Sequence, residues 1–152
     1  ARFSNNFLVH PIPWMVLRRM SSPIRILAMN TLSRKELGPW GEKIAASYLR
    51  HKGYTILQHN IRTPYGEIDL LASQADTLIF VEIKTRSSAS LGNPEISITP
   101  KKFAHMVSSA QSYLLEHPEI DTGWRIDVIS VLRRNAGQSP EIVHFENITD
   151  AH

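Results

Sequence analysis

The chain of 152 residues contains no cysteine, which excludes disulfide frameworks and zinc sites built from thiolates. Such a chain suits a reducing compartment, and we expect a cytoplasmic protein. The seven histidines are scattered without the spacing of zinc ligands, and we interpret them as solvated or packing residues. Long hydrophobic runs are also missing, because His10, Pro11 and Pro13 interrupt the apolar stretch Phe7–Leu17. That stretch is too short and broken to cross a bilayer, so we expect no membrane partner.

Acidic residues are absent from positions 1–35, which hold six of the seventeen basic residues: Arg2, Arg18, Arg19, Arg25, Arg34 and Lys35. Residues 36–152 therefore carry eleven basic and fourteen acidic residues, a formal charge of −3, although the whole chain is +3. The net charge thus does not indicate a phosphate-binding surface, and any such surface has to be local. We expect residues 1–35 to be a basic extension, disordered or translated from upstream of the natural start, that adds little to the core. An organellar transit peptide is a further alternative, and residues 36–152 are expected to form one domain.

Helical and strand patterns follow one another along residues 36–152. Gly38-Pro39 is expected to open a helix, with proline at its first position, and Gly53 to end it. Thr99 is expected to cap a second helix that begins with Pro100. Five strands are predicted, at Tyr54–Ile61, Glu67–Ala72, Thr77–Arg86, Trp124–Leu132 and, at an edge of the sheet, Glu141–Phe145. The order α-β-β-β-α-β-β predicts an α/β fold in which helices flank a central mixed sheet.

The predicted central strand carries charges within an apolar run. Its sequence Leu78-Ile79-Phe80-Val81-Glu82-Ile83-Lys84 is typical of a strand buried on both faces. Because side chains alternate along a strand, Glu82 and Lys84 share one face, and burying charges without partners is costly. In the preceding strand Asp69 lies on the face opposite Ile68. A hairpin of the two strands would bring Asp69 to Glu82.

Glu42 adds a third acid, from the apolar stripe of the first predicted helix. We expect Glu42, Asp69 and Glu82 to line one cavity with Lys84 beside them. Carboxylates held close together repel one another, and a divalent cation relieves that repulsion. Oxygen ligands favour a hard ion, so the predicted cofactor is Mg²⁺ or Mn²⁺. The alternative is a structural ion pair, either of Glu82 with Lys84 or of Lys84 with Asp69.

Asp69, twelve intervening residues and then Glu82-Ile83-Lys84 resemble the signature of the PD-(D/E)XK nucleases. That superfamily includes restriction endonucleases and archaeal Holliday-junction resolvases; Ile68 stands where its name has proline. Longer segments carry a more specific likeness: Gly41-Glu42, Gly53-Tyr54, Asn60, Gly66-Glu67-Ile68-Asp69-Leu70, Phe80-Val81-Glu82-Ile83-Lys84-Thr85-Arg86, Gly92, Pro94 and Arg125-Ile126-Asp127-Val128. Together they resemble the bacterial YraN family, over roughly residues 38–148.

The resemblance implies the restriction-endonuclease-like three-layer fold and a nuclease-like domain over residues 36–152, in a family that is largely uncharacterised. Its motif implies that Asp69 and Glu82 are metal ligands, Lys84 the catalytic lysine and Glu42 the acid carried by a helix. Lys102 matches a basic position that opens the second helix. Phe103 departs from the relatives, which often carry glutamine there.

Phosphodiester hydrolysis is the chemistry that such a site supports. The candidate catalytic residues are Asp69, Glu82, Lys84 and Glu42. A bound cation lowers the pKa of its water, and Lys84 would orient that water or stabilise the pentavalent transition state. The candidates for phosphate contacts are Lys102, Arg86 and Arg62, with ordinary surface charge as the alternative. Since nothing resembles a base-reading module, we predict an Mg²⁺-dependent endonuclease that acts on structured or branched DNA without sequence specificity.

Two other functions remain open from the sequence. A nucleic-acid-binding module of the same fold would bind DNA without cutting it, but it would not need Lys84 beside the metal ligands. A protein-interaction scaffold would leave the three acids unexplained. A homodimer would suit a symmetric branched substrate, and no sequence feature demonstrates one.

Overall fold

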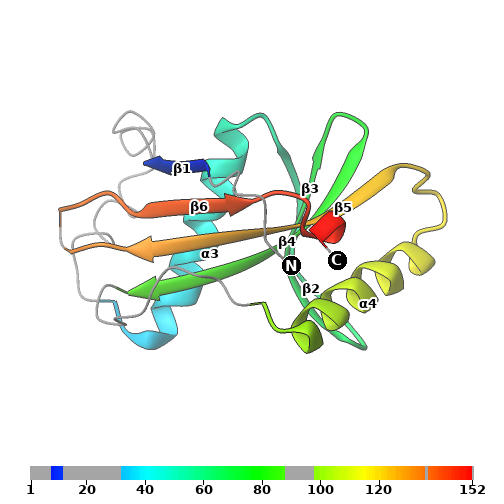
Figure 1. Ribbon diagram of the computed structural model, residues 1–152, viewed down its shortest axis with the longest axis horizontal. Helices are drawn as coiled ribbons and strands as arrows, with labels where there is room; N and C mark the ends of the chain where they lie inside the picture. Colours follow the sequence, from blue (N-terminus) through cyan, green and yellow to red (C-terminus); the bar gives the residue numbers. More distant parts are fainter. Residues whose placement is uncertain (1–7, 12–31, 88–97, 136, 152) are drawn as a thin grey trace.

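The computed structural model describes residues 8–11, 32–87, 98–135 and 137–151. Six strands form one sheet in the order β1-β6-β5-β4-β3-β2 (Figure 1). The strands are β1 (Leu8–Pro11), β2 (Thr55–Thr63), β3 (Gly66–Gln74), β4 (Thr77–Ser87), β5 (Gly123–Arg133) and β6 (Glu141–Phe145). β4 and β5 are parallel, and every other neighbouring pair is antiparallel. The predicted mixed sheet and the order α-β-β-β-α-β-β are confirmed.

The first long helix, α3 (Arg34–His51), begins earlier than predicted. Ser33 caps it, since its backbone N–H and its hydroxyl both donate to Oε2 of Glu36, at 2.9 and 2.7 Å. Pro39 therefore lies inside the helix, and the expectation that it occupies the first position was wrong. The Ser33–Glu36 pair supplies a start signal of its own, one turn ahead of the proline.

The second long helix, α4 (Pro100–Glu116), begins where the sequence predicts. The side chain of Thr99 accepts the backbone N–H of Lys102 at 3.2 Å, and Pro100 occupies the first turn. A short 3₁₀ helix, η1 (Ile148–Ala151), follows β6. No helix within the described ranges is long and apolar enough to span a membrane.

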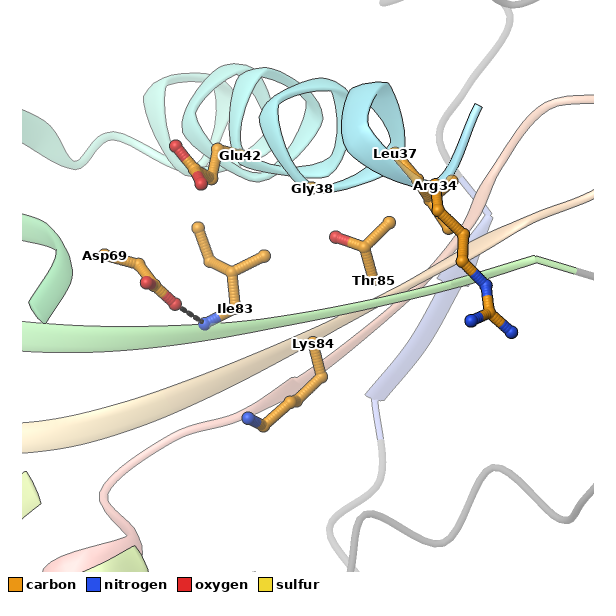
Figure 2. A pocket seen from close by; sticks show the side chains of 8 residues that line it. All are labelled: Arg34, Leu37, Gly38, Glu42, Asp69, Ile83, Lys84 and Thr85. Atoms are coloured by element: carbon orange, nitrogen blue, oxygen red, sulfur yellow. Dashed lines mark hydrogen bonds between the residues drawn. The ribbon is translucent and has the colours of Figure 1, made fainter. Parts of the chain in front are cut away.

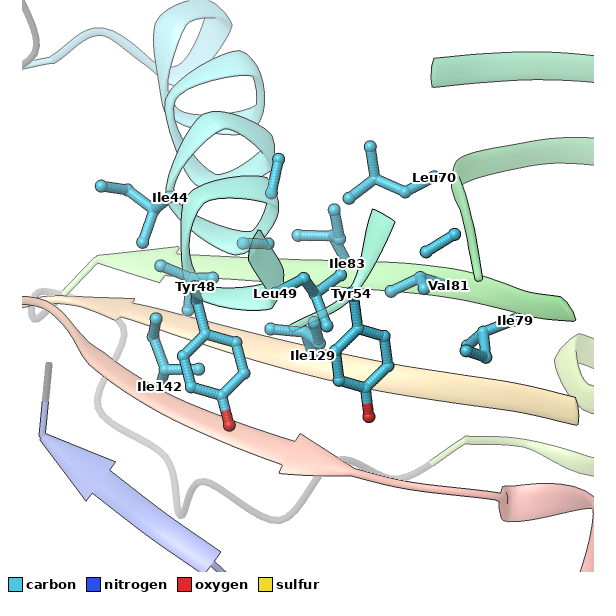
Figure 3. Close-up of a cluster of buried hydrophobic side chains, with 14 of the residues drawn as sticks. Ile44, Tyr48, Leu49, Tyr54, Leu70, Ile79, Val81, Ile83, Ile129 and Ile142 are labelled. Atoms are coloured by element: carbon cyan, nitrogen blue, oxygen red, sulfur yellow. The ribbon is translucent and has the colours of Figure 1, made fainter. Parts of the chain in front are cut away.

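The two long helices cover opposite faces of the sheet, which gives three layers. On the α3 side the core consists of Trp40, Ile44, Ala45, Ala46, Tyr48, Leu49, Tyr54, Leu70, Ala72, Ile79, Val81, Ile83, Ile129, Val131 and Ile142 (Figure 3). On the α4 side it consists of Ile68, Leu71, Leu78, Phe80, Met106, Ala110, Tyr113, Ile126 and Val128. Alternation along β4 thus divides its apolar side chains between both layers, as predicted, and each fully buried leucine or isoleucine contributes about 1.5–3 kcal/mol.

The N-terminal strand corrects one expectation. β6 was expected at an edge of the sheet, but β1 pairs antiparallel with it, from Leu8 opposite His144 to Pro11 opposite Glu141. The backbone N–H and C=O groups along the outer side of β6 can pair with a further strand, which here is β1. Pro11 lies at the end of β1, where an edge strand tolerates proline. Residues 1–7 and 12–31 lie outside the described residues. That residues 1–35 add little to stability stays a prediction.

Candidate functional site

The pairing of β3 with β4 ends just before Asp69. Its antiparallel register runs from Gln74 opposite Thr77 to Leu70 opposite Val81. Beyond that point the backbone N–H of Ile83 donates a hydrogen bond of 2.6 Å to Oδ2 of Asp69. The Asp69 carboxylate thus accepts this N–H in place of a backbone carbonyl of β3. Asp69 therefore lies where the pairing of β3 with β4 has ended, a place that we call the gap between the two strands.

A cavity of about 350 Å³ lies beside this gap. Its lining residues come from α3, β3 and β4: Arg34, Leu37, Gly38, Glu42, Asp69, Ile83, Lys84 and Thr85. Figure 2 shows Glu42 projecting from α3, and Lys84 extending from the opposite side of β4. The Glu42 carboxylate accepts a hydrogen bond of 3.4 Å from the side-chain amide of Asn60. The cavity therefore offers carboxylate oxygens on the α3 side of the sheet.

Asp69 is the least compensated acid in this region. Burial raises its pKa to about 6, because desolvation disfavours the charged form. The hydrogen bond from Ile83 opposes that shift, whereas the nearby carboxylates of Glu82 and Glu42 add to it. Lys102 lowers the pKa, as the weakest of these influences. The surroundings of Asp69 therefore favour either a proton or a cation.

Glu82 is neutralised differently. It is buried, with 6% of its surface exposed. Its Oε1 accepts a hydrogen bond of 2.6 Å from Nζ of Lys84, two residues further along the same strand. The same oxygen lies 2.9 Å from Nζ of Lys102, which comes from the first turn of α4. The ion pair of Glu82 with Lys84, foreseen as the alternative, is thus present and includes a second lysine.

The three predicted metal ligands are divided between the two faces of the sheet. Glu82 faces α4, Glu42 reaches in from α3, and Asp69 lies in the gap between them. Among the described residues, no three histidine or acidic side chains lie close enough to hold a metal ion. Glu42 and Asp69 line the cavity and Glu82 does not. That the three acids bind one metal ion stays a prediction. The apolar stripe of α3 indicates that Glu42 faces the sheet, but it does not tell which face the helix covers.

The three candidates for phosphate contacts lie in different places. Lys102 joins the site through Glu82. Arg86 lies on β4, four residues after Glu82 and on the same face by alternation. Arg62 is exposed on the edge strand β2, opposite Glu67. Neither arginine lines the cavity.

Sequence reasoning missed two residues of the cavity region. Arg34 lines the cavity, although it was counted only as part of the basic extension. Gly41 lets α3 approach β4 closely, because a Cβ at this position would lie 1.8 Å from Oγ1 of Thr85. A glycine beside Glu42 in a predicted helix was the available signal, since glycine inside a helix usually has a packing reason.

A second charged cluster on β5 and β6 was also missed. The fully buried Asp127 accepts hydrogen bonds from Nε of Arg125 at 2.9 Å and from the backbone N–H of Asn147 at 2.8 Å. Nε2 of the buried His144 lies 2.9 Å from its other oxygen, and Arg125 also donates to the hydroxyl of Tyr54 at 2.9 Å. Asp127, like Glu82, is a charged residue within an apolar predicted strand. The reasoning that identified Glu82 therefore applies to Asp127 as well.

Comparisons with known proteins agree with the sequence resemblance. The model of the uncharacterised protein family UPF0102 matches residues 41–131. A UPF0102 protein of Syntrophomonas wolfei is 46% identical over 98 residues, which cover 64% of this chain and 85% of the relative. A UPF0102 protein of Syntrophotalea carbinolica is 45% identical over 120 residues, 79% of this chain and 96% of the relative. The expected YraN-family resemblance is confirmed: the chain belongs to the uncharacterised protein family UPF0102.

Proposed function

We propose that this protein is a metal-dependent nuclease that hydrolyses phosphodiester bonds in structured or branched DNA without reading its sequence. The observation that carries this proposal is the position of Asp69. Its carboxylate lies in the gap between β3 and β4, with a pKa raised to about 6. Acids from both faces of the sheet influence it electrostatically, so a cation placed there would interact with all three carboxylates.

The residues around the gap fit a hard divalent cation. Their donors are carboxylate oxygens, which Mg²⁺ and Mn²⁺ prefer over other ligands. Asp69 would be the shared ligand, and its repulsion by Glu42 and Glu82 is the conflict that a divalent charge relieves. When bound, the ion neutralises a phosphate oxygen and lowers the pKa of a bound water.

The basic residues would act on the substrate itself. Lys84 lines the cavity, and its ammonium lies beside Glu82 on the other side of β4, where it would stabilise negative charge on the phosphorus oxygens. Lys102 and Arg86 extend the positive charge along the α4 side, and Arg62 lies on the hairpin of β2 and β3. These residues would contact phosphates, which fix the position of DNA without reading its bases.

The test uses the purified chain with flapped, four-way, duplex and single-stranded DNA, in Mn²⁺ or Mg²⁺. Wild-type protein is expected to cut a structured substrate, and Asp69→Asn is expected to abolish both cutting and Mn²⁺ binding. Asp76→Asn is the matched control, because it makes the same chemical change in the exposed turn between β3 and β4. Cutting that survives Asp69→Asn, or the absence of Mn²⁺ binding in a calorimetric titration, would contradict the proposal.

A DNA-binding module that does not cut is the second candidate. The observation that favours it is the pairing of Glu82 with two lysines, Lys84 and Lys102. In that case DNA would bind equally well with and without Mn²⁺. Asp69→Asn would leave the affinity for DNA unchanged.

A further inference from the structure

Two ammonium groups share one oxygen of Glu82. Nζ of Lys84 lies 2.6 Å from Oε1, and Nζ of Lys102 lies 2.9 Å from the same atom. Lys84 reaches Glu82 from its own strand. Two positive charges thus face one carboxylate, and Lys102 is the partner supplied by another element of the fold.

The start of α4 is an unfavourable place for a lysine. The backbone N–H of Lys102 is fixed by Thr99 at 3.2 Å, so the side chain originates within the first turn. That turn contains no acid, and a helix N-terminus carries a partial positive charge that disfavours cations. The charge of Lys102 is therefore compensated by Glu82 rather than by its own helix. The neighbouring Lys101 is exposed and differs from Lys102 in this respect.

We propose that Lys102 is a displaceable counterion of Glu82: a divalent cation at the site takes its place, and the released ammonium binds a phosphate of the nucleic acid. This inference rests on the proposed function and concerns the regulation of the same site. Displacement leaves Lys102 beside both a metal ion and the positive end of α4. A phosphate oxygen is the anion that the substrate can bring to that position.

The exchange couples metal binding to substrate binding. Without DNA, Lys102 competes with the metal ion for Glu82 and weakens metal binding. With DNA, the phosphate holds Lys102 and the competition ends, so DNA strengthens metal binding and the metal strengthens DNA binding by the same factor. Removing the ammonium should therefore act in opposite directions, tightening the binding of metal alone and weakening the binding of DNA.

The first measurement is calorimetric titration of Mn²⁺ into wild type, Lys102→Met and Lys101→Met in the absence of DNA. We expect Lys102→Met to bind Mn²⁺ about fivefold more tightly or better, and Lys101→Met to match wild type. Lys84 still pairs with Glu82 in the variant, so the fold should persist. Lys102→Gln, which keeps a polar side chain of similar length, provides a second variant with the same expected result.

The second measurement is fluorescence anisotropy of a labelled flap duplex at several salt concentrations, with Ca²⁺ in place of Mn²⁺. We expect Lys102→Met to bind more weakly, with a salt dependence reduced by about one phosphate contact, and Lys101→Met to change less. Unchanged or weaker Mn²⁺ binding by Lys102→Met would overturn the counterion exchange while leaving the metal site itself in place. Failure of wild type and all variants alike to bind Mn²⁺ would overturn the proposed function, and this inference with it.

Discussion

Asp69 is half-buried and Asp127 is fully buried, and both lie on strands of one sheet, separated by β4. Asp127 has three kinds of partner, the Arg125 guanidinium, the His144 ring and the backbone N–H of Asn147. Burial alone would raise the pKa of Asp127, but hydrogen bonds from those three partners hold it below its usual value. For Asp69 the hydrogen bond from Ile83 does not offset burial, and the pKa rises to about 6.

Asp127 is the more deeply buried acid and yet has the lowered pKa, so the opposite pKa shifts follow from compensation by partners rather than from burial. An acid surrounded by donors stays charged and ties strands together, as Asp127 does for β5 and the segment after β6. An acid surrounded by other acids is stabilised by binding a proton or a cation. Residues with a strongly shifted pKa of this kind are common at functional sites. The first region therefore stabilises the fold, and the second is the candidate for chemistry.

The largest expected effect is the loss of Asp127. Asp127→Ala removes the shared acceptor and leaves the half-buried Arg125 and the buried His144 without their main partner. Breaking a buried charged pair on one side costs about 3–5 kcal/mol of unfolding free energy. Urea denaturation followed by circular dichroism measures this loss. A loss below about 1 kcal/mol would mean that the cluster is not the structural region that the comparison assigns.

Asp69→Asn should have the opposite sign. The amide oxygen of asparagine can still accept the Ile83 N–H, whereas the uncompensated charge disappears. The rise in pKa from 3.8 to about 6 corresponds to up to about 3 kcal/mol, so the metal-free variant should be more stable than wild type by that order at pH 8. Urea denaturation in the presence of a chelator tests this. A destabilised variant would show that Asp69 is held as a structural acid, like Asp127.

The pH dependence sharpens the same contrast. Because the pKa of Asp69 is raised in the folded state, folding takes up a proton, and wild type gains stability as the pH falls through 6 towards 3.8. Between pH 8 and pH 5 wild type should regain about 1.4 kcal/mol relative to Asp69→Asn. Asp127 behaves in the opposite way, since its lowered pKa supplies stability that is lost only as the pH falls below 3.8. A stability difference between wild type and Asp69→Asn that does not vary over this range would contradict the assignment.

Local patterns predicted the parts of the fold that depend on neighbouring residues. The Thr99 cap with Pro100 and the alternation along β4 follow from chain geometry alone, and the structure confirms both. The element order follows from the same patterns. The predicted start of α3 at Pro39 was wrong, because Ser33 and Glu36 form a capping signal earlier in the chain.

The parts that failed depend on long-range contacts. Which face of the sheet α3 covers decides whether Glu42 meets Glu82, and helical periodicity alone does not contain that information. The pairing of β1 with β6 joins residues at least 130 positions apart, so no local pattern reveals it. The placement of Asp69 in a gap depends on where β3 and β4 stop pairing, which a two-residue alternation does not show.

The smallest expected effect concerns the rim of the Asp127 cluster. Glu146 is 41% exposed and lies 3.4 Å from Nζ of Lys52, 3.7 Å from Arg125 and 3.8 Å from Nδ1 of His144. These distances resemble those of an ion-pair network, but solvent screens the glutamate, and exposed pairs contribute about 0–1 kcal/mol. Glu146→Gln should therefore lower the unfolding free energy by less than about 1 kcal/mol, and the loss should shrink further in 1 M salt. A loss that matched Asp127→Ala and resisted salt would show that Nδ1 of His144 depends on Glu146. The cluster around Asp127 would then include the exposed Glu146. Asp127 and Asp69 would in that case differ in how many partners they have, and not in how deeply those partners are buried.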